Sequence, residues 1–475
     1  MKRGDSVRFN ALLDAELRTK SRRRRETLRD DAAAALIIHG ARNDPTPNLE
    51  LVWRSPQELI APPRNVRKVE KVHVHEVGRS IVALGFCDPA LIDETNTVID
   101  GMIAVEAAKD LGLERIPCVV ARHLSTTQRR QLRLALNRLQ ERGAWNIEEL
   151  KFEMQELVLE GVSLEVTGFS SGELDQILLG EASLADRGPL ELDDSEPIAR
   201  PGDVFLLGPH KIVCGDSKDD AALAAIMGQD QARIVATDEP FNVKIAGHVT
   251  GGAHREFAMA SGELSDAEFM TFNKDWIRVA LPRLCEGGVL GSFIDWRGYH
   301  ILHAAALEFG LTPLNLVVWS KTNGGMGSLY RSQHELFPLY KKGRKAHVNN
   351  VQLGKDGRWR SNVWSYPGAS SMGSDARRGL HEHPTVKPVA MLEDALLDLT
   401  NRGDIVLDPF LGSGSTLIAA ERTGRICRGV EIDPHYVDLV VRRYEACTGT
   451  TAILEKRHEP RVRLRAMSER KIPCK

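Results

Sequence analysis

The stretch Asp408-Pro409-Phe410-Leu411-Gly412-Ser413-Gly414-Ser415-Thr416 decides the fold of this 475-residue chain. Residues 404–408 predict a strand, the glycines predict a tight turn, and residues 416–423 predict a helix. Glu431 ends the next predicted strand and lies 17 residues after Gly414. An acid about 20 residues after such a turn accepts hydrogen bonds from ribose hydroxyls. The pattern indicates a nucleoside-bearing ligand, and the alternative is a turn that merely needs its glycines.

Alternating strands and helices surround this unit over residues 199–447, which is typical of a doubly wound α/β sheet. A helix is expected over 267–284, and further strands are expected over 212–216, 233–238, 288–295, 314–319, 334–340 and 426–432. Asp216 and Asp238 each end a predicted strand, where open parallel sheets bind their ligands. Asp295 also ends a predicted strand, and we assign it no role.

A second stretch, His383-Pro384-Thr385-Val386-Lys387-Pro388, precedes the glycine turn by about 20 residues. Pro388 is suited to the first turn of the helix that follows, because its fixed φ angle favours that position. The free amides at such a helix start favour an anion. Taken alone, the stretch is also compatible with an ordinary helix start.

Together the two stretches resemble the cofactor motifs of amino-type DNA methyltransferases, and Asp238-Glu239-Pro240-Phe241 resembles the catalytic tetrapeptide Asp-Pro-Pro-Tyr/Phe of that family. Catalytic motif first and cofactor motif last is the order of the beta class. The resemblance implies catalytic roles for Asp238, Pro240 and Phe241, double-stranded DNA as the partner, and no metal. It also implies S-adenosyl-L-methionine as the cofactor, bound by Asp408, Phe410, Gly412, Gly414, Thr416, Glu431, Lys387 and Asp216.

The chemistry of the family accounts for these residue types. The lone pair of an exocyclic base amine is delocalised into the ring, and it becomes nucleophilic when acceptors hold the amine protons. The Asp238 carboxylate and the backbone carbonyl after it are such acceptors, and transfer is an in-line displacement helped mainly by positioning. The base must first be flipped from the duplex, and the Phe241 ring is suited to stack on it.

Glu239 departs from the family pattern, because it stands where the first proline is expected. Glutamate loosens the backbone there and adds a charge beside Asp238. It either accepts an amine proton or fills the base pocket. Two functions therefore remain open. The first is a site-specific DNA methyltransferase, with adenine N6 favoured over cytosine N4. The second is a catalytically impaired, methyltransferase-like DNA-binding protein.

Polar loops flank the predicted site. Residues 318–332 are rich in glycine and polar side chains, and Asn242, Lys244 and His248 follow the tetrapeptide. The resemblance implies that such segments face DNA, and basic and aromatic side chains suit phosphate contact and stacking. The alternative is that they are ordinary surface loops.

The N-terminal part resembles the ParB-like (sulfiredoxin-like) domain. The similarity lies in Pro63-Arg64-Asn65-x-Arg67, Ile99-Asp100-Gly101, Glu106-Ala107-Ala108, residues 111–118 and Asn137-Arg138-Leu139. Gly101-Met102-Ile103-Ala104 replaces the usual Gly-His-x-Arg, so we expect contact with DNA or protein, or a structural role, and no nuclease activity. Ser125 and Gln128 form a capping-box pattern that predicts a helix start.

The composition of the two ends of the chain differs from that of the middle. Residues 1–30 hold ten Lys/Arg against five Asp/Glu, and residues 455–475 hold eight against three, so both ends are basic arms for a polyanion or solvated tails. Scattered cysteines and the lack of a signal peptide or membrane span predict a cytoplasmic protein. The oligomeric state stays open, a homodimer included. We expect a basic tail at 1–48, the ParB-like domain at 49–145, a helical segment and acidic linker at 146–198, the methyltransferase domain at 199–447 and a basic tail at 448–475.

Overall fold

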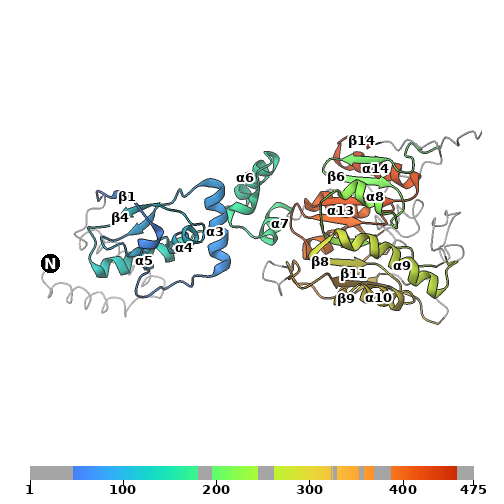
Figure 1. Ribbon diagram of the computed structural model, residues 1–475, viewed down its shortest axis with the longest axis horizontal. Helices are drawn as coiled ribbons and strands as arrows, with labels where there is room; N and C mark the ends of the chain where they lie inside the picture. Colours follow the sequence, from blue (N-terminus) through green and yellow to red (C-terminus); the bar gives the residue numbers. More distant parts are fainter. Residues whose placement is uncertain are drawn as a thin grey trace, which may run out of the picture. The chain divides into compact units, whose positions relative to one another are not determined.

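The computed structural model describes residues 47–179, 195–243, 262–322, 324, 329–351, 358–368 and 387–456. The chain divides into two compact units, Met1–Phe169 and Ser170–Lys475 (Figure 1). Within these described ranges, every helix is too short or too polar to cross a lipid bilayer. Several predictions lie outside the described residues. They are the roles of Lys244 and His248, the start of the second cofactor stretch at His383–Val386, and most of the basic tails predicted at 1–48 and 448–475.

The first unit is built on a four-stranded sheet with the strand order β1-β4-β2-β3. Helix α4 buries Val105 and Ala108 against this sheet, and the capping box of Ser125 and Gln128 opens α5 as predicted. Gly101 has φ of +87°, and a Cβ there would lie 3.3 Å from the Ala90 backbone. The elements are β1 Glu50–Arg54, η1 Pro56–Glu58, α3 Lys71–Leu84, β2 Ala90–Ile92, β3 Val98–Asp100, α4 Met102–Asp110, β4 Ile116–Val120, α5 Thr126–Gln140, α6 Ile147–Leu159 and η2 Leu164–Thr167.

The second unit is built on a ten-stranded sheet with the order β11-β9-β10-β8-β7-β12-β13-β6-β5-β14. Its strands are β5 Val204–Leu207, β6 His210–Cys214, β7 Ala232–Thr237, β8 Leu284–Ser292, β9 Thr312–Lys321, β10 His334–Lys341, β11 Val363–Tyr366, β12 Ile405–Asp408, β13 Ile426–Glu431 and β14 Ile453–Lys456. The five central strands, β8 to β6 in that order, are parallel.

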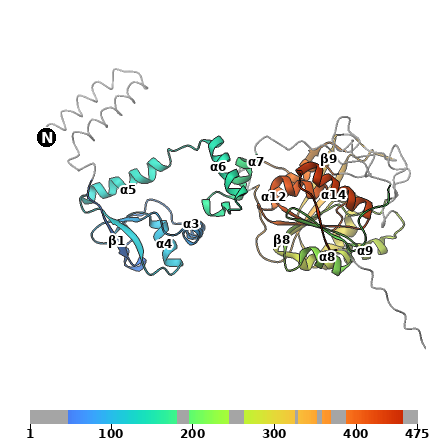
Figure 2. The same ribbon diagram turned by 90° about the horizontal axis from the view of Figure 1, so that it is seen from above.

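Helices cover both faces of this sheet, which confirms the predicted doubly wound fold (Figure 2). One face is packed by α12 Val389–Leu399, α13 Ser415–Thr423 and α14 Pro434–Thr448, and the other by α8 Asp220–Met227, α9 Asp266–Ala280 and α10 Tyr299–Glu308. The short helix η3, Leu281–Arg283, joins α9 to β8. Strand β8 begins earlier than predicted and ends at Ser292, because the chain turns at Asp295 to start α10.

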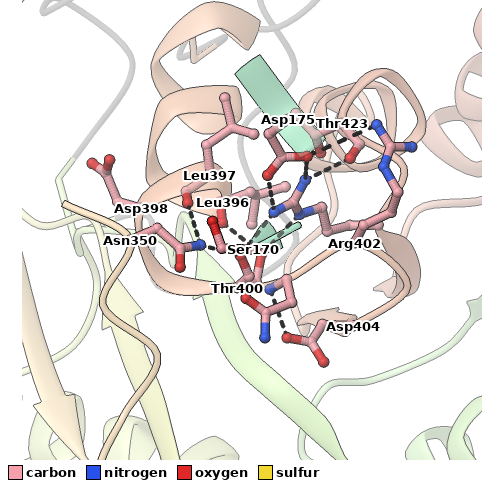
Figure 3. Close-up of polar contacts among 12 residues, drawn as sticks. Ser170, Asp175, Asn350, Leu396, Leu397, Asp398, Thr400, Arg402, Asp404 and Thr423 are labelled. Carbon is pink, nitrogen blue, oxygen red and sulfur yellow. Dashed lines mark hydrogen bonds and ion pairs between the residues drawn. The ribbon is translucent and has the colours of Figure 1, made fainter. Parts of the chain in front are cut away.

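The sequence groups residues 146–198 as one helical segment and acidic linker. Helix α7, Ser171–Leu179, within that range, belongs to the second unit. The reason is a buried ion pair, in which Arg425 donates to both oxygens of Asp175, at 2.9 and 2.8 Å. The same guanidinium group binds Thr400 and the Thr423 carbonyl (Figure 3). At the other end of the sheet, β14 pairs with β5 inside the predicted C-terminal tail.

Candidate functional site

The candidate site lies where the strand order of the large sheet reverses. From β12 the chain continues outward to β13 on one side, whereas β7 leads to β8 on the other side. Ligands of open α/β sheets bind outside the carboxyl ends of the strands at such a switch point. Asp238 follows β7 and Asp408 ends β12, so both predicted site residues stand at this point. Thr237 Oγ1 joins the two strand ends by donating to Asp408 Oδ1 at 2.6 Å.

The glycine turn is shaped by backbone conformations that favour glycine. Gly412 has φ of +53° and Gly414 has φ of +83°, both in the left-handed region. A Cβ on Gly414 would lie 3.1 Å from Val440, so a side chain there would also crowd α14. Gly414 caps α13, and the strand–turn–helix order is the predicted one.

Glu431 fastens this turn from the end of β13. Its carboxylate accepts from the Gly412 amide and from the Asp433 amide, each at 2.8 Å. Burial raises the pKa of Glu431 to about 7, and the two amide donors act in the opposite direction. Each oxygen keeps a second lone pair, so the carboxylate can still accept from a ligand hydroxyl.

Asp408 is tied to the protein rather than turned outward. Besides the Thr237 hydroxyl, its Oδ1 accepts from the Phe410 amide at 3.0 Å. Burial raises the pKa of Asp408, while hydrogen bonds from Thr237 and Thr416 lower it. The contacts of Asp408 and Thr416 therefore shape the turn. The Phe410 ring packs 5.8 Å from Phe272, centroid to centroid, which anchors the turn to α9.

The end of β6 brings one predicted and one unpredicted residue toward β13. Asp216 accepts from the Lys218 amide at 2.9 Å, and the Gly215 amide donates to the Glu431 carbonyl at 2.8 Å. The adjacent Ser217 hydroxyl is buried and has no hydrogen-bond partner among the described residues. Buried hydroxyls are usually hydrogen-bonded, so this unpaired group makes Ser217 a candidate for contact with a ligand. Its position after a strand-ending acid is the sequence signal that could have found it.

A buried charge cluster forms around Asp238. Lys387 Nζ lies 2.7 Å from Asp238 Oδ2 and 3.1 Å from Glu335 Oε2, and Glu335 also binds Lys321. Lys387, predicted to hold the cofactor, thus contacts the catalytic candidate, and its role toward the cofactor stays a prediction. Glu335, at the start of β10, was not predicted, although a carboxylate heading an apolar strand is a visible signal. Burial opposes its charge, but Lys387 and Lys321 outweigh that effect and lower the pKa of Glu335 to about 2.

The two oxygens of Asp238 have different surroundings. Oδ2 is held by Lys387, whereas Oδ1 is buried and has no hydrogen-bond partner among the described residues. Burial raises the pKa of Asp238 to about 6, and the charge of Lys387 limits that rise. Asp238 thus presents one positioned oxygen that is open to a donor. An exocyclic amine is a donor of the required kind.

Aromatic rings line this cluster. Lys387 Nζ lies 5.2 Å from the ring centroids of Phe241 and Phe293 and 5.8 Å from that of Trp319. Phe241 is half-buried and packs against the cores on both faces of the sheet. The rings place the charges in an apolar setting, where a planar base could stack.

Glu239 does not enter the Asp238 cluster. It is 1% exposed and lies beside Trp276 and Tyr340, which belong to the core on the α9 face, whereas Asp238 meets Lys387 on the other side. The Trp276 indole donates to Asn273 at 3.3 Å, and both Glu239 oxygens lack a well-aligned partner among the described residues. Burial raises the pKa of Glu239 well above its ordinary value, which favours the neutral acid.

Asn242, the residue after the tetrapeptide, forms hydrogen bonds within the protein. Asn242 has φ of +56°, and its amide donates to the Leu264 carbonyl at 2.7 Å while its Oδ1 accepts from the Gly262 and Leu264 amides. That Asn242 faces DNA stays a prediction. Its side chain fastens the segment that leads into α9.

Comparison with known proteins adds independent findings. Residues 232–442 match the model of the N6/N4 DNA methylase family. The type II methyltransferase M2.DpnII of Streptococcus pneumoniae is 32% identical over 183 residues, which are 37% of this chain and 67% of that relative. The chain thus spans about two thirds of the length of this relative.

Two solved structures are similar to parts of the chain. The crystal structure of an M1.HpyAVI–SAM complex is 22% identical and covers 49% of this chain and 97% of that chain, with a TM-score of 0.37. A C-terminally truncated ParB from Caulobacter crescentus, complexed with CTP-γ-S, is 16% identical and covers 27% of this chain and 77% of that chain, with a TM-score of 0.25. The resemblance of residues 49–145 to a ParB-like domain stays a prediction.

Proposed function

The chain belongs to the N6/N4 DNA methylase family, and we propose that it is a site-specific DNA methyltransferase. In this proposal it moves a methyl group from S-adenosyl-L-methionine to the exocyclic amine of a flipped base in double-stranded DNA. One observation carries the proposal: Asp238, at the switch point, has one oxygen held by Lys387 and one buried oxygen without a partner. That geometry suits a carboxylate that accepts a hydrogen bond from the target amine.

The residues at the carboxyl ends of β6, β12 and β13 fit the cofactor. The left-handed Gly412 and Gly414 lack side chains, so the backbone of the turn can approach a ligand closely, and Ser217 offers a buried, unpaired hydroxyl. We propose that Glu431 accepts from the ribose hydroxyls and that Ser217 and Asp216 face the adenine. The amides at the start of α12, which follows Pro388, favour the carboxylate of the amino-acid part. When bound, this cofactor supplies an electrophilic methyl group on sulfur.

The residues of the chain hold the target amine and the flipped base in position for transfer. Asp238 Oδ1 accepts one amine hydrogen, which directs the nitrogen lone pair out of the base plane, and the carbonyl after Asp238 accepts the other. Lys387 fixes the carboxylate so that little reorganisation is needed during transfer. Phe241 stacks on the extruded base. Pro240 constrains the backbone that aims the carbonyl.

Adenine N6 is the proposed target in preference to cytosine N4, because the family that the tetrapeptide resembles leans to adenine. Both bases present an exocyclic amine to the same acceptors. The rival, an impaired DNA-binding protein, rests on Glu239 as a disturbance of the catalytic carboxylate. The position of Glu239 beside Trp276, away from the Lys387 cluster, supports the active enzyme.

The test is transfer of labelled methyl from S-adenosyl-L-methionine to unmethylated genomic DNA, followed by digestion to nucleosides. The expected product is N6-methyladenine. N4-methylcytosine as the only product would overturn the preference for adenine and leave the methyltransferase intact. No label, with cofactor binding intact by calorimetry, would overturn the methyltransferase and favour the impaired protein.

A further inference from the structure

A turn between β8 and α10 exposes an aromatic ring and a cation together. Trp296 is 55% exposed, and the Arg297 guanidinium carbon lies 4.8 Å from its ring centroid. The Arg297 side chain is itself exposed. A large exposed ring with a stacked arginine is a common arrangement at binding surfaces, because both groups have flat faces that another flat group can cover.

The turn is held in one conformation before any partner binds. Asp295 Oδ1 accepts from the Arg297 amide at 3.0 Å and from the Gly298 amide at 2.8 Å. Its Oδ2 accepts from Arg297 Nη1 at 3.0 Å, which directs the guanidinium along the indole face. Asp295 therefore has a role that the sequence did not indicate, and the surface needs little ordering on binding.

The turn lies on the same edge of the sheet as Asp238. Strands β7 and β8 are parallel neighbours, with Thr237 paired to Ser292, and the Phe293 amide donates to the Thr237 carbonyl at 2.9 Å. Asp238 leaves the sheet one residue after that carbonyl. Trp296 follows Phe293 by three residues, so the turn that carries it leaves the sheet at the same edge as Asp238.

A second exposed segment reaches the same edge. Ile294 bridges Leu336 in antiparallel register, which brings the start of β10 beside the turn. Just before β10, Tyr330 is 84% exposed and Arg331 is exposed. In the described residues 295–300 and 329–334 the only carboxylate is Asp295, and it is already bound by Arg297. This edge is thus aromatic and cationic, which matches a polyanion with stacked bases.

We propose that Trp296 and Arg297 form a contact surface for duplex DNA beside the flipped base, which rests on the proposed function. Trp296 stacks on a base that flipping leaves without its neighbour, and Arg297 pairs with a phosphate of the same strand. The surface contributes affinity for the duplex and no group to the transfer step. Its partner is DNA rather than a protein or a second copy of this chain.

The test compares Trp296→Ala, Arg297→Ala and Trp359→Ala in the full chain. Trp359 is the matched control, because it is also an exposed tryptophan, at 80%. It follows Arg358, which binds Asp398 near the carboxyl end of α12. The chain runs from that end of α12 back into β12. The probe is unmethylated genomic duplex fragments, with the dissociation constant measured by fluorescence anisotropy over a range of salt concentrations. Calorimetry with S-adenosyl-L-methionine checks that each variant is folded.

Trp296→Ala should weaken DNA binding by roughly 5- to 100-fold, and Trp296→Phe should restore most of the loss, because a ring still stacks. Arg297→Ala should reduce the salt slope by about 0.9, the value for one phosphate contact. Trp359→Ala should change neither quantity. Equal affinity of Trp296→Ala and Trp359→Ala, beside a wild type that binds and methylates DNA, would overturn this inference alone. A wild type that does not bind DNA would overturn the proposed function as well. If Trp296→Ala changed the mass of the oligomer and left the DNA affinity unchanged, the surface would bind a second copy of this chain, and the inference would be overturned.

Discussion

The ammonium group of Lys387 holds Asp238 by one oxygen, at 2.7 Å, and leaves the other oxygen open. Glu335 holds the same ammonium group from the far side, at 3.1 Å. Asp238 follows β7, Lys387 precedes α12 and Glu335 lies in β10, so three distant parts of the chain meet here. Because the three charges are in contact, a change in one of them shifts the pKa of the others.

The acid limb of the pH–rate profile should shift in opposite directions in two variants. Burial raises the pKa of Asp238 to about 6, the charge of Lys387 lowers it, and the charge of Glu335 raises it. As an acceptor Asp238 must be ionised, so activity should fall as the pH drops through about 6. Glu335→Gln should move that limb to lower pH, and Lys387→Met should move it to higher pH. Methylation rates at saturating cofactor and DNA across roughly pH 5 to 9 check this, and shifts of the same sign would contradict it.

Glu239 should make folding stability depend on pH. Its pKa is raised by burial in the folded state, so the folded protein binds the proton more tightly than the unfolded chain does. The stabilisation is complete below the ordinary glutamate pKa and is lost as the pH rises toward the raised value. Glu239→Gln keeps the shape without the titration. It should therefore match the wild type in acid and exceed it increasingly as the pH rises above the ordinary glutamate pKa, measured by urea unfolding. A parallel pH dependence of the two proteins would show that Glu239 does not titrate in this range.

Activity of a Glu239→Pro variant separates the two readings of that residue. Because Glu239 lies away from the Asp238 cluster, restoring the family's proline should leave the methylation rate close to that of the wild type. A large gain in rate would instead favour an impaired native enzyme. Cofactor affinity by calorimetry is the folding control for this comparison.

Helix α7 should contribute to the stability of the second unit through one ion pair. Asp175→Ala leaves the buried Arg425 guanidinium without its carboxylate, which should lower the free energy of unfolding by about 3–5 kcal/mol. Gln176→Ala, an exposed neighbour on the same helix, should change it by less than about 0.5 kcal/mol. Urea unfolding of both variants checks this, and equal stability would mean that α7 is only loosely attached.

Cofactor affinity should depend on Glu431 more than on its neighbours. Glu431→Ala removes a proposed ribose acceptor and frees the Gly412 amide, so binding of S-adenosyl-L-methionine should weaken by roughly 10- to 100-fold. Ser217→Ala should cost less, because a hydroxyl makes a neutral hydrogen bond. Calorimetry on both variants gives the comparison, and a Glu431→Ala variant with wild-type affinity would contradict the proposed ribose contact.

The parts of the site encoded by adjacent residues could be predicted from the sequence. The strand, the glycine turn and Glu431 follow one another in the chain, and their residue types allow few conformations. The Lys387–Asp238–Glu335 cluster could not be predicted, because its members are far apart in the chain and meet only through strand order. The sequence did allow a prediction that the Glu239 side chain points away from that of Asp238, since successive residues of an extended chain point to opposite faces. The attachment of α7 was not, because Asp175 and Arg425 lie 250 residues apart.

The most direct test of the account is single-turnover methyl transfer by Asp238→Asn beside the wild type. Asparagine keeps the size of the side chain, but it lacks the negatively charged carboxylate that Lys387 orients. With cofactor affinity unchanged by calorimetry, the account predicts label in DNA from the wild type and a rate constant at least about 100-fold lower in the variant. An Asp238→Asn variant as fast as the wild type would contradict the role of the open Asp238 oxygen.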